Sequence, residues 1–165
     1  MKTKEKEKKM SNRFYFAYGS NMNPERIRER IPHARLVGKA TIYGWKLVER
    51  LYADIERTKG HRVEGVLYLV NDSEILRLDA YEGYPRIYAS VGVIAHVRLV
   101  GRLQAFTYTM TDTTKAERQG KAYPQDYRLI CSAGAQAHGV KDSFKRKGDP
   151  ERGISLTSGL WWRVN

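Results

Sequence analysis

The segment Phe14–Pro24 constrains three consecutive elements of the fold. It opens with a run of aromatic and apolar residues, which favours a half-buried β-strand. The run breaks at Gly19–Asn21, a combination that is typical of a turn. Asn23 and Pro24 then supply a helix N-cap and a first helical residue. The chain is therefore predicted to form a strand, a loop and a helix in immediate succession.

A loop of this kind can bind an anion. Backbone N–H groups at the start of a helix lack acceptors within the helix, and the helix dipole favours negative charge there. A phosphate or a carboxylate would fit, although the local pattern taken alone favours a plain turn. The segment has neither the Gly-Lys-Ser/Thr ending of a P-loop nor the G-x-G-x-x-G run of a dinucleotide fold, so we do not expect nucleotide binding.

Strand-like and helix-like segments follow along the rest of the chain. β-Favouring residues punctuated by glycines predict strands over 34–49, 50–55, 62–70, 87–97 and 102–110, with a turn at Lys59-Gly60. Capping residues predict a helix over 73–82 and a last helix over 125–138, and 111–121 is interpreted as a flexible linker. About six strands with three separate helices predict an α+β fold, in which a curved, mixed or mostly antiparallel sheet closes into a small barrel with peripheral helices.

Length and composition predict one domain between two basic ends. At 165 residues and 41% hydrophobic content, the chain can bury a single sizeable core. We expect a disordered basic tail at 1–11, the folded domain at 12–140 and a basic extension at 141–165. Because no apolar run is long enough to span a bilayer, we expect a cytoplasmic protein without a membrane partner. The pair Trp161-Trp162 is expected to dock on the domain, or to cover a second subunit in a homodimer.

The net charge of +12 raises the question of a nucleic-acid partner. Half of this surplus lies near the ends: residues 2–9 hold five Lys and two Glu, and residues 141–163 hold six basic and three acidic residues. The remaining surplus is scattered among acidic residues, as on a solvated surface. Solubility and attraction of small anions are therefore favoured over nucleic-acid binding.

A second informative segment, residues 78–85, lies at the end of the helix predicted to begin near Ser73. Asp79 and Glu82 are three residues apart, so they project from the same helical face. A carboxyl packed against the apolar and aromatic residues of this segment would be partly desolvated, which raises its pKa and suits it to transfer protons near neutral pH. Glu82 is therefore a candidate acid/base residue, although an isolated glutamate beside a helix stop is more often a surface carboxylate.

Other chemistry has less support. The single cysteine, Cys131, lies in an apolar helical segment and is expected to be packed rather than reactive. Ser20 lacks a G-x-S-x-G context and an evident histidine base. The four histidines lack paired metal-ligand spacing. We therefore expect neither serine nucleophilic catalysis nor a metal site.

Four motifs occur in a defined order along the chain. They are the Tyr18–Asn21 loop after the first strand, the Leu-Asp-x-x-Glu-Gly helix end at 78–83, the strand 106–110, and the helix 123–135 followed by His138-Gly139. In this order and spacing they resemble the gamma-glutamylcyclotransferase family. The resemblance covers about 13–140, and the chain beyond Val140 does not align with the family's pattern.

This resemblance implies a small mixed α/β fold whose barrel cavity holds a γ-glutamyl group, with no metal and no cofactor. It implies that Glu82 is the acid/base residue, that Tyr108 is a binding tyrosine and that Asp79 has a structural or supporting role. Binding of the glutamyl α-carboxylate and carbonyl oxygens is implied for Tyr18, Gly19, Ser20, Asn21, Met22 and Asn23. The implied reaction is cyclisation of a small-molecule γ-glutamyl substrate to 5-oxoproline, in which the free α-amine attacks the γ-carbonyl.

The sequence leaves the leaving group open, because an amino acid, a peptide, an isopeptide or a polyamine-like amine would present the same glutamyl end. The alternative function is a non-catalytic basic module of the same fold that binds RNA, a phosphorylated ligand or another protein. The presence of Glu82 argues against this alternative.

Overall fold

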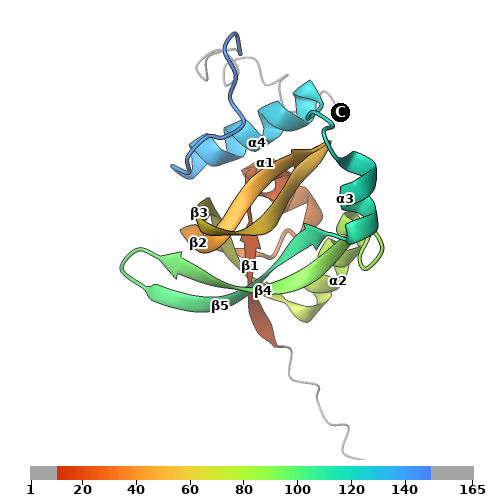
Figure 1. Cartoon of the computed structure of the whole chain (residues 1–165). Helices are drawn as coiled ribbons and strands as arrows, with labels where there is room; N and C mark the ends of the chain where they lie inside the picture. Colours follow the sequence, from red (N-terminus) through yellow and green to blue (C-terminus); the bar gives the residue numbers. More distant parts are fainter. Residues whose placement is uncertain (1–10, 150–165) are drawn as a thin grey trace, which may run out of the picture.

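A computed structural model describes residues 11–149, and in it five strands close into a barrel in the order β1-β3-β2-β4-β5 (Figure 1). The other neighbouring strands in the barrel are antiparallel, but β1 and β5 pair in parallel, with Phe14 opposite Ala105. This parallel contact closes the barrel. The strands are β1 (Asn12–Ala17), β2 (Arg35–Arg50), β3 (Tyr52–Asn71), β4 (Tyr88–Val97) and β5 (Gly101–Met110). The predicted α+β fold with a mixed barrel is confirmed.

The helices lie around the barrel. They are the short 3-10 helix η1 (Ser20–Met22), α1 (Pro24–Arg30), α2 (Asp72–Glu82), α3 (Asp112–Arg118) and α4 (Gln125–Ala137). Figure 1 shows α4 lying across one end of the barrel near α1, and α4 also contacts η1. Within residues 11–149, no helix has the length and apolar character needed to cross a membrane.

Residues close together in sequence determine where the helices begin and end. The Asn23 side chain caps α1 by accepting hydrogen bonds from two N–H groups of its first turn, and Pro24 is the first helical residue. Asn71 and Glu74 form a reciprocal capping box at the start of α2. Gly83 ends α2 in the left-handed conformation, at φ 64°. These boundaries confirm the predictions from local motifs.

Two predicted features are wrong. Residues 111–121 were expected to form a flexible linker, but they contain α3, which Thr111 caps through its side chain. Lys59-Gly60 was expected to be a turn, but both residues lie inside β3. The strand stays paired with β2 on both sides of an irregular stretch, so the predicted strands 50–55 and 62–70 are largely one long strand. The chain reverses instead at Leu51, where φ is 64°.

The described parts of the two predicted end segments contact the domain. Ser11 donates hydrogen bonds to the Asp72 carboxylate from its amide and its hydroxyl, at 3.2 and 2.7 Å. Residues 141–149 follow α4, and Phe144 is buried there. The rest of the predicted tail, residues 1–10, and the pair Trp161-Trp162 lie outside the described residues.

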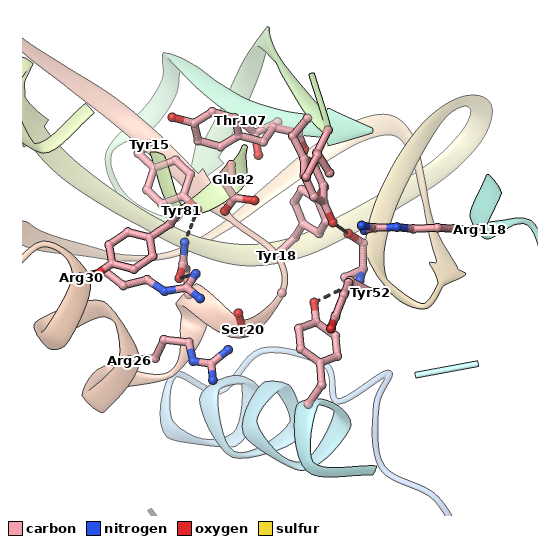
Figure 2. A pocket seen from close by; sticks show the side chains of 17 residues that line it. Tyr15, Tyr18, Ser20, Arg26, Arg30, Tyr52, Tyr81, Glu82, Thr107 and Arg118 are labelled. Atoms are coloured by element: carbon pink, nitrogen blue, oxygen red, sulfur yellow. Dashed lines mark hydrogen bonds between the residues drawn. The ribbon is translucent and has the colours of Figure 1, made fainter. Parts of the chain in front are cut away.

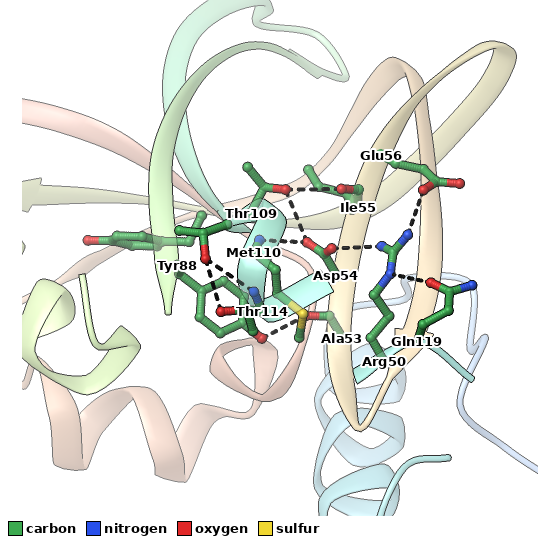
Figure 3. Close-up of polar contacts among 12 residues, drawn as sticks. Arg50, Ala53, Asp54, Ile55, Glu56, Tyr88, Thr109, Met110, Thr114 and Gln119 are labelled. Carbon is green, nitrogen blue, oxygen red and sulfur yellow. Dashed lines mark hydrogen bonds and ion pairs between the residues drawn. The ribbon is translucent and has the colours of Figure 1, made fainter. Parts of the chain in front are cut away.

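The β2–β3 hairpin carries a fully buried carboxylate, Asp54. One carboxylate oxygen accepts a hydrogen bond from Arg50 at 2.8 Å. The other accepts from the Met110 amide at 2.9 Å and from the Thr109 hydroxyl at 3.1 Å (Figure 3). The buried charge is therefore compensated by a cation and by two further donors. These bonds attach the hairpin to β5.

Arg50 extends the same network to the segment after α3. Its guanidinium donates to the carboxylate of Glu56 at 2.7 Å and to the side-chain oxygen of Gln119 at 3.3 Å. Nearby, the Leu51 amide at the hairpin turn donates to the Lys121 carbonyl at 2.7 Å. The hairpin and the end of α3 are thereby held together, and they form one wall of the cavity described next.

Candidate active site

A cavity of about 290 Å³ opens between the loop after β1, the end of α2 and the β2–β3 hairpin. Among residues 11–149, its lining contains seven tyrosines, three arginines and a single carboxyl, that of Glu82. Figure 2 shows Glu82 between the arginines. Such a cavity suits a small polar ligand that carries negative charge.

The loop predicted to bind an anion lies on the cavity wall. Tyr18 and Gly19–Asn21 line the cavity. The first hydrogen bond of η1 is donated by the Met22 amide to the Gly19 carbonyl at 3.1 Å. The turn therefore makes no use of the Ser20 and Asn21 amides, which are the donors that an anion at this helix start would need.

The side chain of Asn21 is held by its neighbours. Its amide nitrogen donates to the Tyr15 hydroxyl at 2.9 Å, and its side-chain oxygen accepts from the Arg30 guanidinium at 2.8 Å. The Tyr68 hydroxyl donates to the Asn21 backbone carbonyl at 3.1 Å. Asn21 is thus fixed in the loop, and it positions the positive charge of Arg30 beside the cavity.

Glu82 is the last residue of α2, and its half-buried side chain lines the cavity. Burial raises the pKa of its carboxyl from 4.5 to about 7, and the nearby charge of Arg30 opposes this rise only in part. A carboxyl with this pKa can both accept and donate a proton at neutral pH. The desolvation expected at this helix end is therefore present in the structure.

Tyr108 from β5 also lines the cavity and is buried. Its hydroxyl donates to the Asp79 carboxylate at 2.6 Å, one turn before Glu82 on α2. Burial and this carboxylate raise the pKa of the Tyr108 phenol, so the phenol stays protonated. In this arrangement the Asp79 carboxylate fixes the orientation of the Tyr108 hydroxyl.

Met22 and Asn23 lie behind the loop rather than on the cavity wall. Met22 is buried in the hydrophobic core. Asn23 caps α1 and donates from its side-chain amide to the Ile130 carbonyl of α4 at 3.2 Å. Neither residue lines the cavity, so their placement does not support the direct binding role that the resemblance implied for them.

Helix α4 approaches the back of this loop very closely at Gly134. A Cβ atom added at Gly134 would lie 2.5 Å from the Asn23 nitrogen and 2.6 Å from the Met22 carbonyl carbon. Because these are backbone atoms, no side-chain rotation could relieve the clash. The absence of a side chain at Gly134 therefore allows α4 to support the loop directly.

Several lining residues were not found from the sequence. Arg26 and Arg30 follow the loop on α1 and are four residues apart, so helical spacing from the loop could have indicated them. Arg118 was missed because its helix was interpreted as a linker. Cys131, by contrast, is buried as expected, and burial raises the pKa of its thiol to about 12.

The hairpin wall is fixed by tyrosines from distant parts of the chain. The Ala53 amide donates to the Tyr127 hydroxyl of α4 at 3.0 Å. The Tyr88 hydroxyl of β4 donates to the Ala53 carbonyl at 3.1 Å. Both backbone groups of Ala53 are thus bound, and no local sequence signal links these three residues.

Comparison with known proteins matches this chain to one family. Residues 15–129 match the family described as gamma-glutamyl cyclotransferase, AIG2-like. The chain is 31% identical to the gamma-glutamylcyclotransferase of Mus musculus and 29% identical to that of Homo sapiens, with 81% of this chain and 75% of each relative covered. A solved structure of a gamma-glutamyl cyclotransferase superposes with a TM-score of 0.68 at 22% identity, covering 93% of this chain and 99% of that one. At this level of identity, the superposition shows a similarity of fold alone.

Proposed function

Because the chain belongs to the AIG2-like gamma-glutamyl cyclotransferase family, we propose that it cyclises a γ-glutamyl compound to 5-oxoproline, with Glu82 as the general acid/base. One observation carries this proposal. Glu82 supplies the single carboxyl among the described residues that line the cavity, and burial raises its pKa to about 7. Proton transfer at neutral pH is the property that this cyclisation requires of an enzyme.

The reaction joins two groups of one molecule. The α-amine attacks the γ-carbonyl carbon, a ring C–N bond forms, and the original amide C–N bond breaks. Holding the chain of the substrate folded removes much of the entropic barrier, a contribution of roughly 7–11 kcal/mol in well-oriented intramolecular reactions. Since an α-amino group has a pKa of about 8, it is mostly protonated at neutral pH and must lose a proton before attack.

Glu82 takes this proton in its ionised form. The same carboxyl, now protonated, donates to the leaving nitrogen as the amide C–N bond breaks. The ring nitrogen, which bears two hydrogens after the attack, loses a second proton through Glu82 as the lactam forms. Two protons thus pass from the α-ammonium to the released amine, which leaves as an ammonium. The glutamyl α-carboxylate binds at the loop formed by Tyr18–Asn21, where the amides of η1 and the charge of Arg30 favour an anion. Tyr108, oriented by Asp79, contacts the bound glutamyl group.

To test the proposal, the purified protein is incubated with γ-glutamyl compounds, and the release of 5-oxoproline is measured by chromatography. We expect product from at least one γ-glutamyl compound without added metal.

The value of kcat/KM should fall about tenfold per pH unit below pH 7, because the protonated Glu82 carboxyl cannot accept a proton. An acidic limb centred near 4.5 would contradict the role given to burial. Failure to release 5-oxoproline from any such compound, with steeply salt-dependent RNA binding, would instead support the basic binding module.

The close approach of α4 to the loop gives a second expectation. The substitution Gly134→Ala should displace α4 from the loop, because the new methyl group would overlap the backbone at Met22 and Asn23. We expect the free energy of unfolding to fall by about 1–3 kcal/mol, as overpacking of a core usually costs. Displacement of the loop should also lower kcat/KM by about tenfold or more.

Gly92→Ala is the matched control for this substitution. Gly92 lies in β4, and a Cβ atom added there meets no other atom within 4 Å. Urea denaturation and 5-oxoproline kinetics of the two variants should therefore differ clearly. If Gly134→Ala matched Gly92→Ala in both measurements, α4 would not be supporting the loop as described.

A further inference from the structure

The cavity holds positive charge on two sides of Glu82 (Figure 2). Arg26 and Arg30 project from α1 on the side of the loop. Arg118 projects from the end of α3 on the side of the hairpin. A bound molecule that reaches from one side to the other therefore meets a cation at each end.

Arg118 belongs to the cavity wall. Its side chain is half-buried, and its guanidinium lies over the Tyr52 ring, 5.4 Å from the ring centre. Burial raises the pKa of the Tyr88 phenol, and the charge of Arg118 is close enough to oppose that rise. Both tyrosines line the same cavity. The guanidinium is therefore directed into a space that the substrate would occupy.

The position of Arg118 is built into the fold. The next residue, Gln119, accepts a hydrogen bond from Arg50, whose guanidinium also binds the buried Asp54 carboxylate. This network ties the end of α3 to the hairpin that carries Tyr52. The connection between α3 and the hairpin thus holds Arg118 in place at the cavity.

Within residues 11–149, no carboxylate forms an ion pair with Arg118. In this described part of the chain, the arginines that do form such pairs are Arg50, Arg128 and Arg146, all of which lie outside the lining of the cavity. Glu82 lines the cavity, but its raised pKa leaves it only partly ionised at neutral pH. A cation that is half-buried and lacks an acidic partner attracts an anion from a ligand.

We propose that Arg118, with Tyr52 beneath it, binds a carboxylate on the leaving group, so that the preferred substrates are γ-glutamyl amino acids rather than γ-glutamyl amines. This inference rests on the proposed function, which assigns the glutamyl α-carboxylate to the loop side of the cavity. The second carboxylate of the substrate then lies on the hairpin side, where Arg118 can bind it with two parallel hydrogen bonds. A leaving group with a cationic end would be repelled by the same guanidinium.

A matched pair of substrates isolates this carboxylate. γ-Glutamyl-alanine and γ-glutamyl-ethylamide differ only by the carboxylate of the leaving group. We expect kcat/KM for 5-oxoproline release to be at least about tenfold higher for γ-glutamyl-alanine, mainly through a lower KM. γ-Glutamyl-1,4-diaminobutane, whose leaving group carries an ammonium, should be the poorest of the three.

Substitutions then assign the preference to one side chain. Arg118→Gln should raise KM for γ-glutamyl-alanine about tenfold and leave γ-glutamyl-ethylamide almost unchanged, whereas Arg118→Lys should retain part of the preference. Arg30→Gln should weaken the binding of both substrates alike, because Arg30 lies beside the loop that binds the shared glutamyl end. Arg98→Gln, at an exposed position between β4 and β5, should keep the wild-type preference.

The outcomes separate this inference from the function on which it rests. Equal turnover of γ-glutamyl-alanine and γ-glutamyl-ethylamide by the wild type would overturn the role of Arg118 and leave the cyclotransferase activity standing. Equal losses on both substrates in Arg118→Gln would do the same, since they indicate a general disturbance of the cavity. Absence of 5-oxoproline from all three compounds would overturn the proposed function itself, and the inference with it.

Discussion

Glu82→Gln should lower kcat for 5-oxoproline release by about 10²–10⁴-fold, the usual contribution of a positioned general acid/base. Glutamine has nearly the same shape as glutamate, so the cavity and the loop should keep their geometry. It cannot accept the proton of the α-amine, and no other carboxyl lines the described cavity. The substrate should therefore still bind, with KM changed much less than kcat.

The same substitution should not destabilise the protein. Burial raises the pKa of the Glu82 carboxyl from 4.5 to about 7, so ionisation is opposed in the folded state but not in the unfolded chain. The wild type therefore loses stability as the pH rises from 4.5 through about 7, and the glutamine variant does not. Its thermal unfolding midpoint should be close to that of the wild type at pH 5 and above it at pH 8.

Two results would contradict the role of Glu82. Retention of substantial activity by Glu82→Gln would show that another group transfers the proton. A marked fall of the unfolding midpoint at pH 8 would show that the carboxyl is needed for folding rather than for proton transfer. The unfolding curves and the kinetics must therefore be measured on the same preparations.

Local sequence predicted those parts of the fold that depend on neighbouring residues. The caps at Asn23 and Asn71 and the stop at Gly83 each involve hydrogen bonds within one helical turn, so the sequence contains all the residues that form them. The interpretation of Lys59-Gly60 as a turn between two strands was wrong because β3 pairs with β2 on both sides of this stretch and continues past it. Strand pairing depends on residues far along the chain, and a glycine alone does not report it.

The residues of the candidate site also fall into two groups: those that belong to local motifs and those that distant contacts bring to the cavity. Tyr18–Asn21 and Glu82 belong to compact motifs, and both line the cavity. The hairpin wall depends on contacts over long sequence separations, such as the bond between Ala53 and Tyr127, 74 residues apart. Arg118 reaches the cavity only because α3 is tied to that hairpin, and these tertiary contacts left no motif in the sequence.

Asp54→Ala should reduce the free energy of unfolding by about 3–5 kcal/mol, the usual cost of removing one partner of a buried ion pair. Asp54 is fully buried, and its loss would leave the buried Arg50 guanidinium with only its more exposed partners. The Met110 amide and the Thr109 hydroxyl would lose an acceptor at the same time. Urea denaturation at pH 7 measures this loss.

Glu56→Ala provides the control within the same network. The Glu56 side chain is 41% exposed and also binds Arg50, so its removal should cost less than about 1 kcal/mol. The double variant Arg50→Met, Asp54→Leu removes both buried charges and should recover much of the stability that Asp54→Ala loses. Equal losses for Asp54→Ala and Glu56→Ala would mean that burial does not set the strength of this network. A double variant no more stable than Asp54→Ala would mean that the hairpin requires these polar contacts themselves, rather than the neutralisation of a buried charge.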